Sequence, residues 1–240
     1  MRNFIFPVLL ALSLVACSTY QYVTLDSPQL QKNYKKEFVY ENDTLKLVYN
    51  FYGEGGPMNL TVYNKTTQPL YIDWKKSALI KEGQSISLFN ANVNVNGSIA
   101  TTSYQPVRSV TSSASGLSAS FTLPQGTDFI PPGSYLNKVL LNVMGSAIRD
   151  MAMFDSLPVH RVSEDGVATS KFRDALYDET RSPVHFITYL TLMSGGNAEK
   201  EFTVQFPFYV KEVMQSDDGP ALFGLYRQEG DNLFVRLGGQ

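Results

Sequence analysis

Short segments in which apolar and polar residues strictly alternate recur along the chain, and they constrain its fold more than any other feature. The clearest is EFTVQFPFYV, residues 201–210. Its apolar residues share one parity: Phe202, Val204, Phe206, Phe208 and Val210. Because successive side chains of a strand point to opposite faces, this pattern predicts a strand with one buried face.

The same alternation predicts strands elsewhere. Residues 44–52 and 57–64 flank the glycine-rich GEGGP and should form an antiparallel pair. Residues 134–144 and 184–193 are rich in β-branched and aromatic residues, and residues 78–80 and 86–88 should form a hairpin around KEGQ.

Two further elements are expected near the C-terminus. ALFGLYRQ (221–228) and NLFVRL (232–237) should form a last hairpin around EGD. SKFRDALYDET (170–180) starts with a possible capping serine, Ser170, and has Phe172 and Leu176 four residues apart. This spacing is typical of a short helix.

Taken together, about nine or ten short strands with turns between them predict an all-β protein, an immunoglobulin-like β-sandwich. Residues 17–36 are polar without a sustained period and should be a tether, which leaves 37–240 as a single sandwich domain. Residues 89–120, rich in Ser, Thr, Asn and Gly, are either a long inserted loop or hairpin or a linker between two domains. We favour the insertion, because the preceding strands are too few to close a sandwich.

An apolar run from Phe4 to Ala16 ends at Cys17, the single cysteine of the sequence. The run follows a basic start and is shorter than the about 20 residues that a spanning helix needs, as in a signal peptide. Leu14–Val15–Ala16–Cys17 resembles the bacterial lipobox. The resemblance implies that residues 1–16 are removed by cleavage after Ala16 and that Cys17 carries palmitate or a similar lipid. The alternative is an ordinary secretory signal with an incidental cysteine.

The charge of the mature chain argues against one class of partner. Without residues 1–16 the chain has 19 basic and 22 acidic residues. Nucleic-acid binding requires a clustered basic face that displaces counterions. We therefore expect no nucleic-acid partner.

The sequence shows no catalytic motif. His160 and His185 do not occur at the spacing of a metal site, and no nucleophilic-serine motif is present. Acidic segments at 41–44, 216–219 and 229–232 could supply oxygens to calcium, but each also fits an ordinary turn. We expect no catalytic residue, no metal and no cofactor.

A weak candidate ligand surface comes from two segments. Trp74 shares parity with Leu70 and Ile72, which favours a core position over a sugar-stacking platform and leaves the opposite strand face exposed. The repeated asparagines of NANVNVNG (90–97) could recognise carbohydrate or form the wet face of a hairpin. The residues of this surface are Tyr71, Asp73, Lys75, Asn92 and Asn94.

Four segments together resemble a family of Bacteroidota lipoproteins without an established activity: the lipobox, LVYNFYGEGG, YNKTTQPLYIDWKKSALI and FIPPGSYL. The resemblance extends over residues 38–140. It implies one domain with a variable insertion. It also implies an outer-membrane location facing the periplasm, because Ser18 follows Cys17 and the first acidic residue is Asp26.

The sequence thus predicts a lipid-anchored module of the cell envelope. Its membrane partner is engaged through the N-terminal lipid, and its further partner should be an envelope protein or glycan that it binds without catalysis. The alternative is an envelope hydrolase or carbohydrate-processing enzyme that uses paired carboxylates, a pair that can form only in the fold.

The lipid anchor is directly testable. Cys17→Ala removes the thiol that would be acylated, so metabolic labelling with an alkyne palmitate should be abolished and the protein should be soluble or remain an uncleaved precursor. Several acyl chains are needed for stable anchoring because each buried CH₂ contributes about 0.8 kcal/mol. Unchanged labelling of the variant would rule out this anchor.

Overall fold

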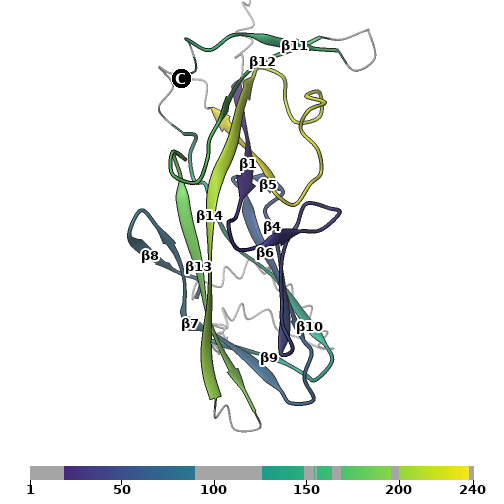
Figure 1. Cartoon of the computed structure of the whole chain (residues 1–240), viewed down its shortest axis with the longest axis vertical. Coiled ribbons are helices and arrows are strands. Elements are labelled where there is room, and N and C mark those ends of the chain that lie inside the picture. Colours follow the sequence, from purple (N-terminus) through teal and green to yellow (C-terminus); the bar gives the residue numbers. More distant parts are fainter. Residues whose placement is uncertain are drawn as a thin grey trace, which may run out of the picture.

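The computed structural model describes residues 19–89, 126–148, 154, 156–163, 169–195 and 200–237. Fifteen strands within these ranges form two sheets packed in a sandwich-like arrangement (Figure 1). The prediction of an all-β protein is confirmed. The insertion from residue 90 onward, Asn92, Asn94, Ala16 and Cys17 lie outside the described residues.

The larger sheet has ten strands. Seven lie side by side in the order β5 (Gly53–Glu54), β15 (Asn232–Leu237), β1 (Thr19–Asp26), β14 (Lys200–Ser216), β13 (His185–Ser194), β7 (Leu70–Lys81) and β8 (Gln84–Ser87). The other three pair beside this row: β9 (Thr127–Ile130) with β7, β12 (Ser170–Leu176) with β14, and β11 (His160–Val162) with β12.

The smaller sheet has five antiparallel strands. Their order is β10 (Tyr135–Asn142), β6 (Pro57–Asn64), β4 (Leu45–Asn50), β3 (Phe38–Glu41) and β2 (Gln31–Lys32). The predicted pairing of 44–52 with 57–64 is confirmed by β4 and β6. Their alternating residues are buried as expected.

The main core lies between the two sheets and is rich in aromatic rings. Phe38 of β3 and Phe51, which directly follows β4, both contact Phe208 of β14. Their ring centroids lie 5.1 and 5.2 Å from that of Phe208. Tyr49 lies 5.5 Å from the same ring and accepts a hydrogen bond from Thr188 Oγ1 at 3.2 Å. The parity of β4 and β14 therefore determines which faces of the two sheets meet.

Trp74 is buried between the sheets, so the prediction that it belongs to the core is confirmed. Its indole nitrogen donates to Asp128 Oδ2 at 2.8 Å, and Lys138 pairs with the same carboxylate oxygen at 2.7 Å. The Lys138 ammonium also lies 4.6 Å from the centroid of the indole ring. A buried indole N–H requires such a partner.

The glycines of GEGGP connect the two sheets. Gly55 and Gly56 adopt φ of +71° and +65°, and Gly56 has Leu233 Cδ2 only 2.6 Å from where a Cβ would be. Their carbonyls accept hydrogen bonds from Met144 and Val143, and β5 pairs in parallel with β15. Only glycine combines this backbone conformation with so close an approach.

Residues 170–180 do not form the expected helix. Residues 170–176 are strand β12, which pairs with the C-terminal half of β14 from Phe172↔Ser216 to Leu176↔Glu212. The spacing of Phe172 and Leu176 also satisfies a period of two, and tertiary pairing with β14 outweighs the weak helical signal. Because β14 has 17 residues, β12 and β13 both pair along one of its edges.

The prediction that residues 17–36 form a tether is wrong. Residues 19–26 are strand β1, which lies between β14 and β15 in the larger sheet. Val23 and Leu25 face the main core, whereas Tyr22 is 1% exposed on the opposite face. The apparent lack of a period arises because both faces of this strand are covered, so its apolar residues do not alternate with solvent-exposed ones.

The expected last hairpin is also wrong. β15 pairs with β1 and β5, and residues 217–231 form a segment without strands that folds back over the outer face of the larger sheet. We call it the fold-back loop (yellow, at the upper right of Figure 1). Within the described residues, no helix is long and apolar enough to span a membrane.

The position of β1 predicts a clear effect of truncation. A chain that begins at residue 18 should unfold cooperatively, whereas one that begins at residue 28 should show no cooperative transition by circular dichroism. The shorter chain lacks β1, a central strand with several buried side chains. Each buried side chain contributes about 1.5–3 kcal/mol, whereas the total stability of a domain is only about 5–15 kcal/mol. Equal unfolding midpoints for the two chains would restore the tether interpretation.

Candidate functional site

A hollow of about 660 Å³ lies between the outer face of the larger sheet and the fold-back loop. We call it the outer hollow. Its floor is formed by side chains of five neighbouring strands, β11, β12, β14, β1 and β15, and its wall by the loop together with Lys36, which lies between β2 and β3. The lining residues are Thr24, Lys36, His160, Phe172, Asp174, Glu212, Met214, Leu225, Arg227, Glu229, Asp231 and Asn232.

Strand register brings the floor residues together. Thr24 of β1 is paired with Glu212 of β14 and with Asn232 of β15. Asp174 of β12 is paired with Met214, two residues from Glu212 on the same face of β14. Residues paired across strands point to one face, so these side chains converge although they are far apart in sequence.

The fold-back loop is held in place by an aromatic cluster on the outer face of β1. Phe223 stacks on Tyr22 with ring centroids 4.5 Å apart, and Tyr226 lies 5.1 Å from the same ring. The Tyr22 hydroxyl donates to the carbonyl of Asp218 at 2.5 Å. The wall of the outer hollow is therefore fixed by packing and does not depend on a ligand.

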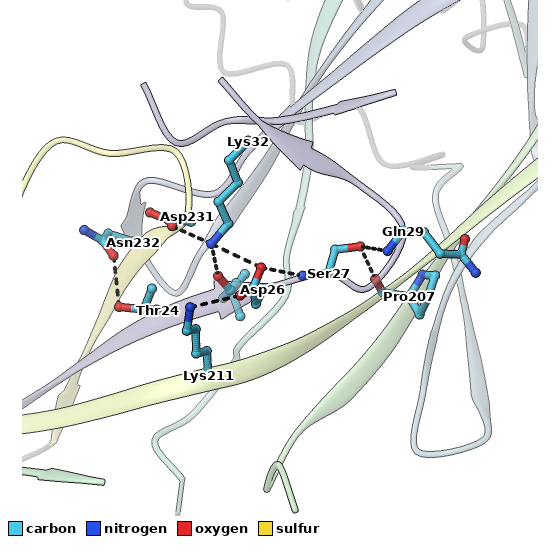
Figure 2. A network of polar contacts seen from close by, with 10 residues as sticks. Thr24, Asp26, Ser27, Gln29, Lys32, Pro207, Lys211, Asp231 and Asn232 are labelled. Atoms are coloured by element: carbon cyan, nitrogen blue, oxygen red, sulfur yellow. Dashed lines mark hydrogen bonds and ion pairs between the residues drawn. The ribbon is translucent and has the colours of Figure 1, made fainter. Parts of the chain in front are cut away.

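A network of charges holds the end of the loop (Figure 2). Lys32 Nζ lies 2.7 Å from Asp231 Oδ2, 2.8 Å from the Leu25 carbonyl oxygen and 3.4 Å from Asp26 Oδ1. Lys211 Nζ approaches Asp26 Oδ2 at 3.2 Å. The ammonium of Lys32 thus connects β2, the end of β1 and the loop.

Two carboxylates of this network differ in how completely their oxygens are paired. Burial disfavours the charged form of Asp26, but Lys32, the Ser27 amide and Lys211 outweigh it and lower the pKa of Asp26. Asp231 is 4% exposed, and its Oδ1 has no hydrogen-bond partner among the described residues. Figure 2 shows this second oxygen on the side of the carboxylate away from Lys32.

The floor contains two neighbouring carboxylates, Asp174 and Glu212. Burial, followed by the negative charge of Asp174, raises the pKa of Glu212, although Thr24 and Lys211 partly oppose the shift. His160 Nε2 lies 3.2 Å from Asp174 Oδ1. The floor therefore places like charges side by side, an arrangement that is costly for folding and typical of functional sites.

The residues expected to form a ligand surface lie elsewhere on the larger sheet. Tyr71 packs on the exposed ring of Phe129 at 5.3 Å. The Asp73 carboxylate accepts hydrogen bonds from the amides of Lys75 and Lys76, where β7 has a bulge against β13. Asp73 thus stabilises backbone.

Lys75 lies apart from the outer hollow. It lines a separate hollow of about 390 Å³ together with Tyr189, Ser85 and Ser87, and its ammonium lies 5.4 Å from the centroid of the Phe89 ring. The described residues of the expected surface, Tyr71, Asp73 and Lys75, therefore make no contribution to the outer hollow.

The outer hollow is not predicted from the sequence, although some of its residues are noted there. The acidic segment 229–232 supplies Glu229, Asp231 and Asn232, and His160 lies at the opposite side. The alternation that identifies β14 does not continue past Val210. A bulge at Lys211, opposite the Thr24–Leu25 step of β1, reverses the parity and places Glu212 and Met214 on the outer face. Alternation alone assigns these two residues to the buried face, so no local pattern indicated this part of the floor.

No metal site is formed by the residues that the structure describes, since no three His, Cys, Asp or Glu side chains gather in a suitable group. Comparison of the chain with protein-family models, with curated proteins and with solved structures finds no match.

The raised pKa of Glu212 predicts a pH-dependent gain in stability on neutralisation. The pKa of Glu212 is higher in the folded protein than its ordinary value of 4.5, so folding favours the protonated side chain. This contribution to stability is fully present at pH values below 4.5 and is lost as the pH rises through the folded-state pKa. Glu212→Gln should therefore be stabilising at neutral pH by about 0.5 kcal/mol, or about 1–2 °C in the midpoint of thermal unfolding.

The difference between Glu212→Gln and the parent protein should disappear at acidic pH. Glu54→Gln is the control, since Glu54 is exposed in β5 and is outside the outer hollow. A lower midpoint for Glu212→Gln at neutral pH would contradict the electrostatic assignment.

Proposed function

We propose that the protein is a non-enzymatic binding module, anchored to the outer membrane through lipid on Cys17 and facing the periplasm, that binds an envelope protein or glycan in the outer hollow. The observation that carries this proposal is the preformed wall: Phe223 and Tyr226 hold the fold-back loop against Tyr22 in the absence of ligand. Concave sites with a few convergent polar groups are the usual form of ligand sites, and preorganisation lowers the entropic cost of binding.

We further propose that the sandwich is an elaborated immunoglobulin-like domain with a single insertion. The chain passes between the sheets from β6 to β7 and from β9 to β10, and Trp74 is buried between them, as in such sandwiches. Strands on either side of residues 90–125 pair with each other, β7 with β9 and β6 with β10. This pairing supports an insertion over a linker between domains. The resemblance to Bacteroidota lipoproteins supports the same arrangement.

A hydrolase is the second candidate, because Asp174 and Glu212 are two neighbouring carboxylates and the pKa of one is raised. Glycosidic cleavage requires carboxyl groups on either side of the scissile bond. Asp174 is paired with Met214 and Glu212 with Leu176, so both carboxylates project from one sheet face as diagonal neighbours. This arrangement favours binding on the floor over cleavage between two walls.

Position-specific crosslinking in intact envelopes tests the proposed function. A photo-crosslinking residue at position 225, in the wall of the outer hollow, should capture a discrete envelope component that mass spectrometry can identify. The matched control is position 222 on the same loop, where Leu222 is 77% exposed but does not line the hollow. We expect the adduct at 225 and not at 222.

Two results would contradict this proposal. Equal capture at positions 225 and 222 would show that the hollow has no special role. Release of new reducing ends from envelope glycan by the parent protein, abolished in Glu212→Gln, would identify the hydrolase in place of the binding module.

A further inference from the structure

The smaller sheet ends in a long free edge, strand β10. Among the described residues, five other strands pair along one edge only, and each has two to four residues: β2, β5, β8, β9 and β11. β10 has eight residues and pairs only with β6. Very short edge strands protect a sheet from pairing with other chains, because they present few unpaired backbone groups. β10 lacks this protection.

The register shows which backbone groups of β10 face the free edge. The amide of Asn64 donates to the carbonyl oxygen of Ser134 at 2.8 Å, next to the pair formed by Tyr135 and Tyr63. A bond in this position belongs to an antiparallel ladder in which Tyr135 and Tyr63 are a non-hydrogen-bonded pair. Every second residue of β10 therefore directs its N–H and C=O away from β6, and no described segment pairs with them. These residues are Tyr135, Asn137 and Val139.

The side-chain rows that cross the smaller sheet are still apolar where they stop at β10. On the outer face, the rings of Tyr63 and Tyr135 lie with centroids 5.2 Å apart, and Tyr135 is 63% exposed. Val139 on the same face is 60% exposed. On the inner face, Leu136 continues a row from the buried Val62 but is itself only partly buried. One further strand at this edge would extend the rows on both faces.

The edge carries no unpaired charge that would repel a second chain. Lys138 is the single charged residue of β10. An inward-pointing charge often prevents edge-to-edge pairing. Here the ammonium is neutralised within the same chain, 2.7 Å from Asp128 Oδ2 and 4.6 Å from the centroid of the Trp74 ring. An identical edge can therefore approach without electrostatic penalty.

We propose that β10 pairs in antiparallel fashion with β10 of a second copy of the chain, around a two-fold axis at Asn137. This register places Asn137 opposite Asn137 of the second copy, and Tyr135 opposite Val139 of the second copy. The three facing pairs each exchange two hydrogen bonds through the free backbone groups.

Side chains favour this register and an identical partner. An aromatic ring opposite a β-branched residue is a stabilising cross-strand pair, and the two-fold axis forms it twice. Lys138 lies opposite Leu136 of the second copy, so the two ammonium groups do not face each other. β10 does not line the outer hollow, and the inference is therefore independent of the proposed function.

Disulfide trapping of the full chain in detergent micelles tests the register. Hydrogen-bonded antiparallel partners have Cα atoms about 5.5 Å apart, within the range of a disulfide. Asn137→Cys should therefore form a linked dimer under mild oxidation. Tyr135→Cys and Val139→Cys should each give little dimer alone and a linked dimer when mixed. The parent protein, which contains Cys17, sets the background, and Thr203→Cys, at an exposed position of β14, should not exceed it.

Sedimentation of the full chain in detergent measures the strength of the dimer. Val139→Lys adds a charge to the edge without disturbing a buried side chain, and it should weaken dimerisation about tenfold. The matched control is Val159→Lys, because Val159 is 50% exposed and lies outside β10. It should change the dissociation constant less than about twofold.

Several results would overturn the inference. A parent protein that is monomeric at every concentration would exclude the second copy. A monomer that dimerises only after deletion of residues 95–115 would assign the edge to the insertion. Equal effects of Val139→Lys and Val159→Lys, or equal linking of Thr203→Cys and Asn137→Cys, would place the contact elsewhere on the surface.

Discussion

The structure depends on the burial of Tyr22 on the outer face of β1, the face that points away from the main core. A large aromatic ring at the centre of a sheet must be covered, and Phe223, Tyr226 and the carbonyl of Asp218 cover it. The fold-back loop is therefore a structural necessity of the larger sheet. The outer hollow lies where this cover ends and the polar floor begins.

The same region includes groups that reduce stability. Like charges on the floor and the unpartnered Oδ1 of Asp231 are both unfavourable for folding. Packing elsewhere compensates for them. The aromatic core between the sheets stabilises the larger sheet on its other face, and β1 lies centrally in that sheet. Such local costs, on a floor that strands hold rigid, are common at functional sites.

Much of the fold follows from alternation within the sequence. The parity of Leu45, Leu47 and Tyr49 predicted β4, and the KEGQ turn, with positive φ at Glu82 and Gly83, predicted the β7–β8 hairpin. Strand β1 could not be recognised in this way because it is covered on both faces. The outer hollow is formed by the pairing of strands that are far apart in the sequence. Thr24 Oγ1 donates a hydrogen bond to Asn232 Oδ1 at 3.1 Å, although 208 positions separate the two residues. No local pattern specifies such contacts.

Methyl NMR gives the most direct test of the outer hollow as a binding site. Met214 lines its floor, whereas Met58 and Met144 are buried in the main core. With ¹³C-labelled methionine methyls, addition of the envelope component captured at position 225 should shift the Met214 signal in a saturable manner and leave those of Met58 and Met144 unchanged. An unchanged Met214 signal, or equal shifts of all three, would contradict binding in the outer hollow.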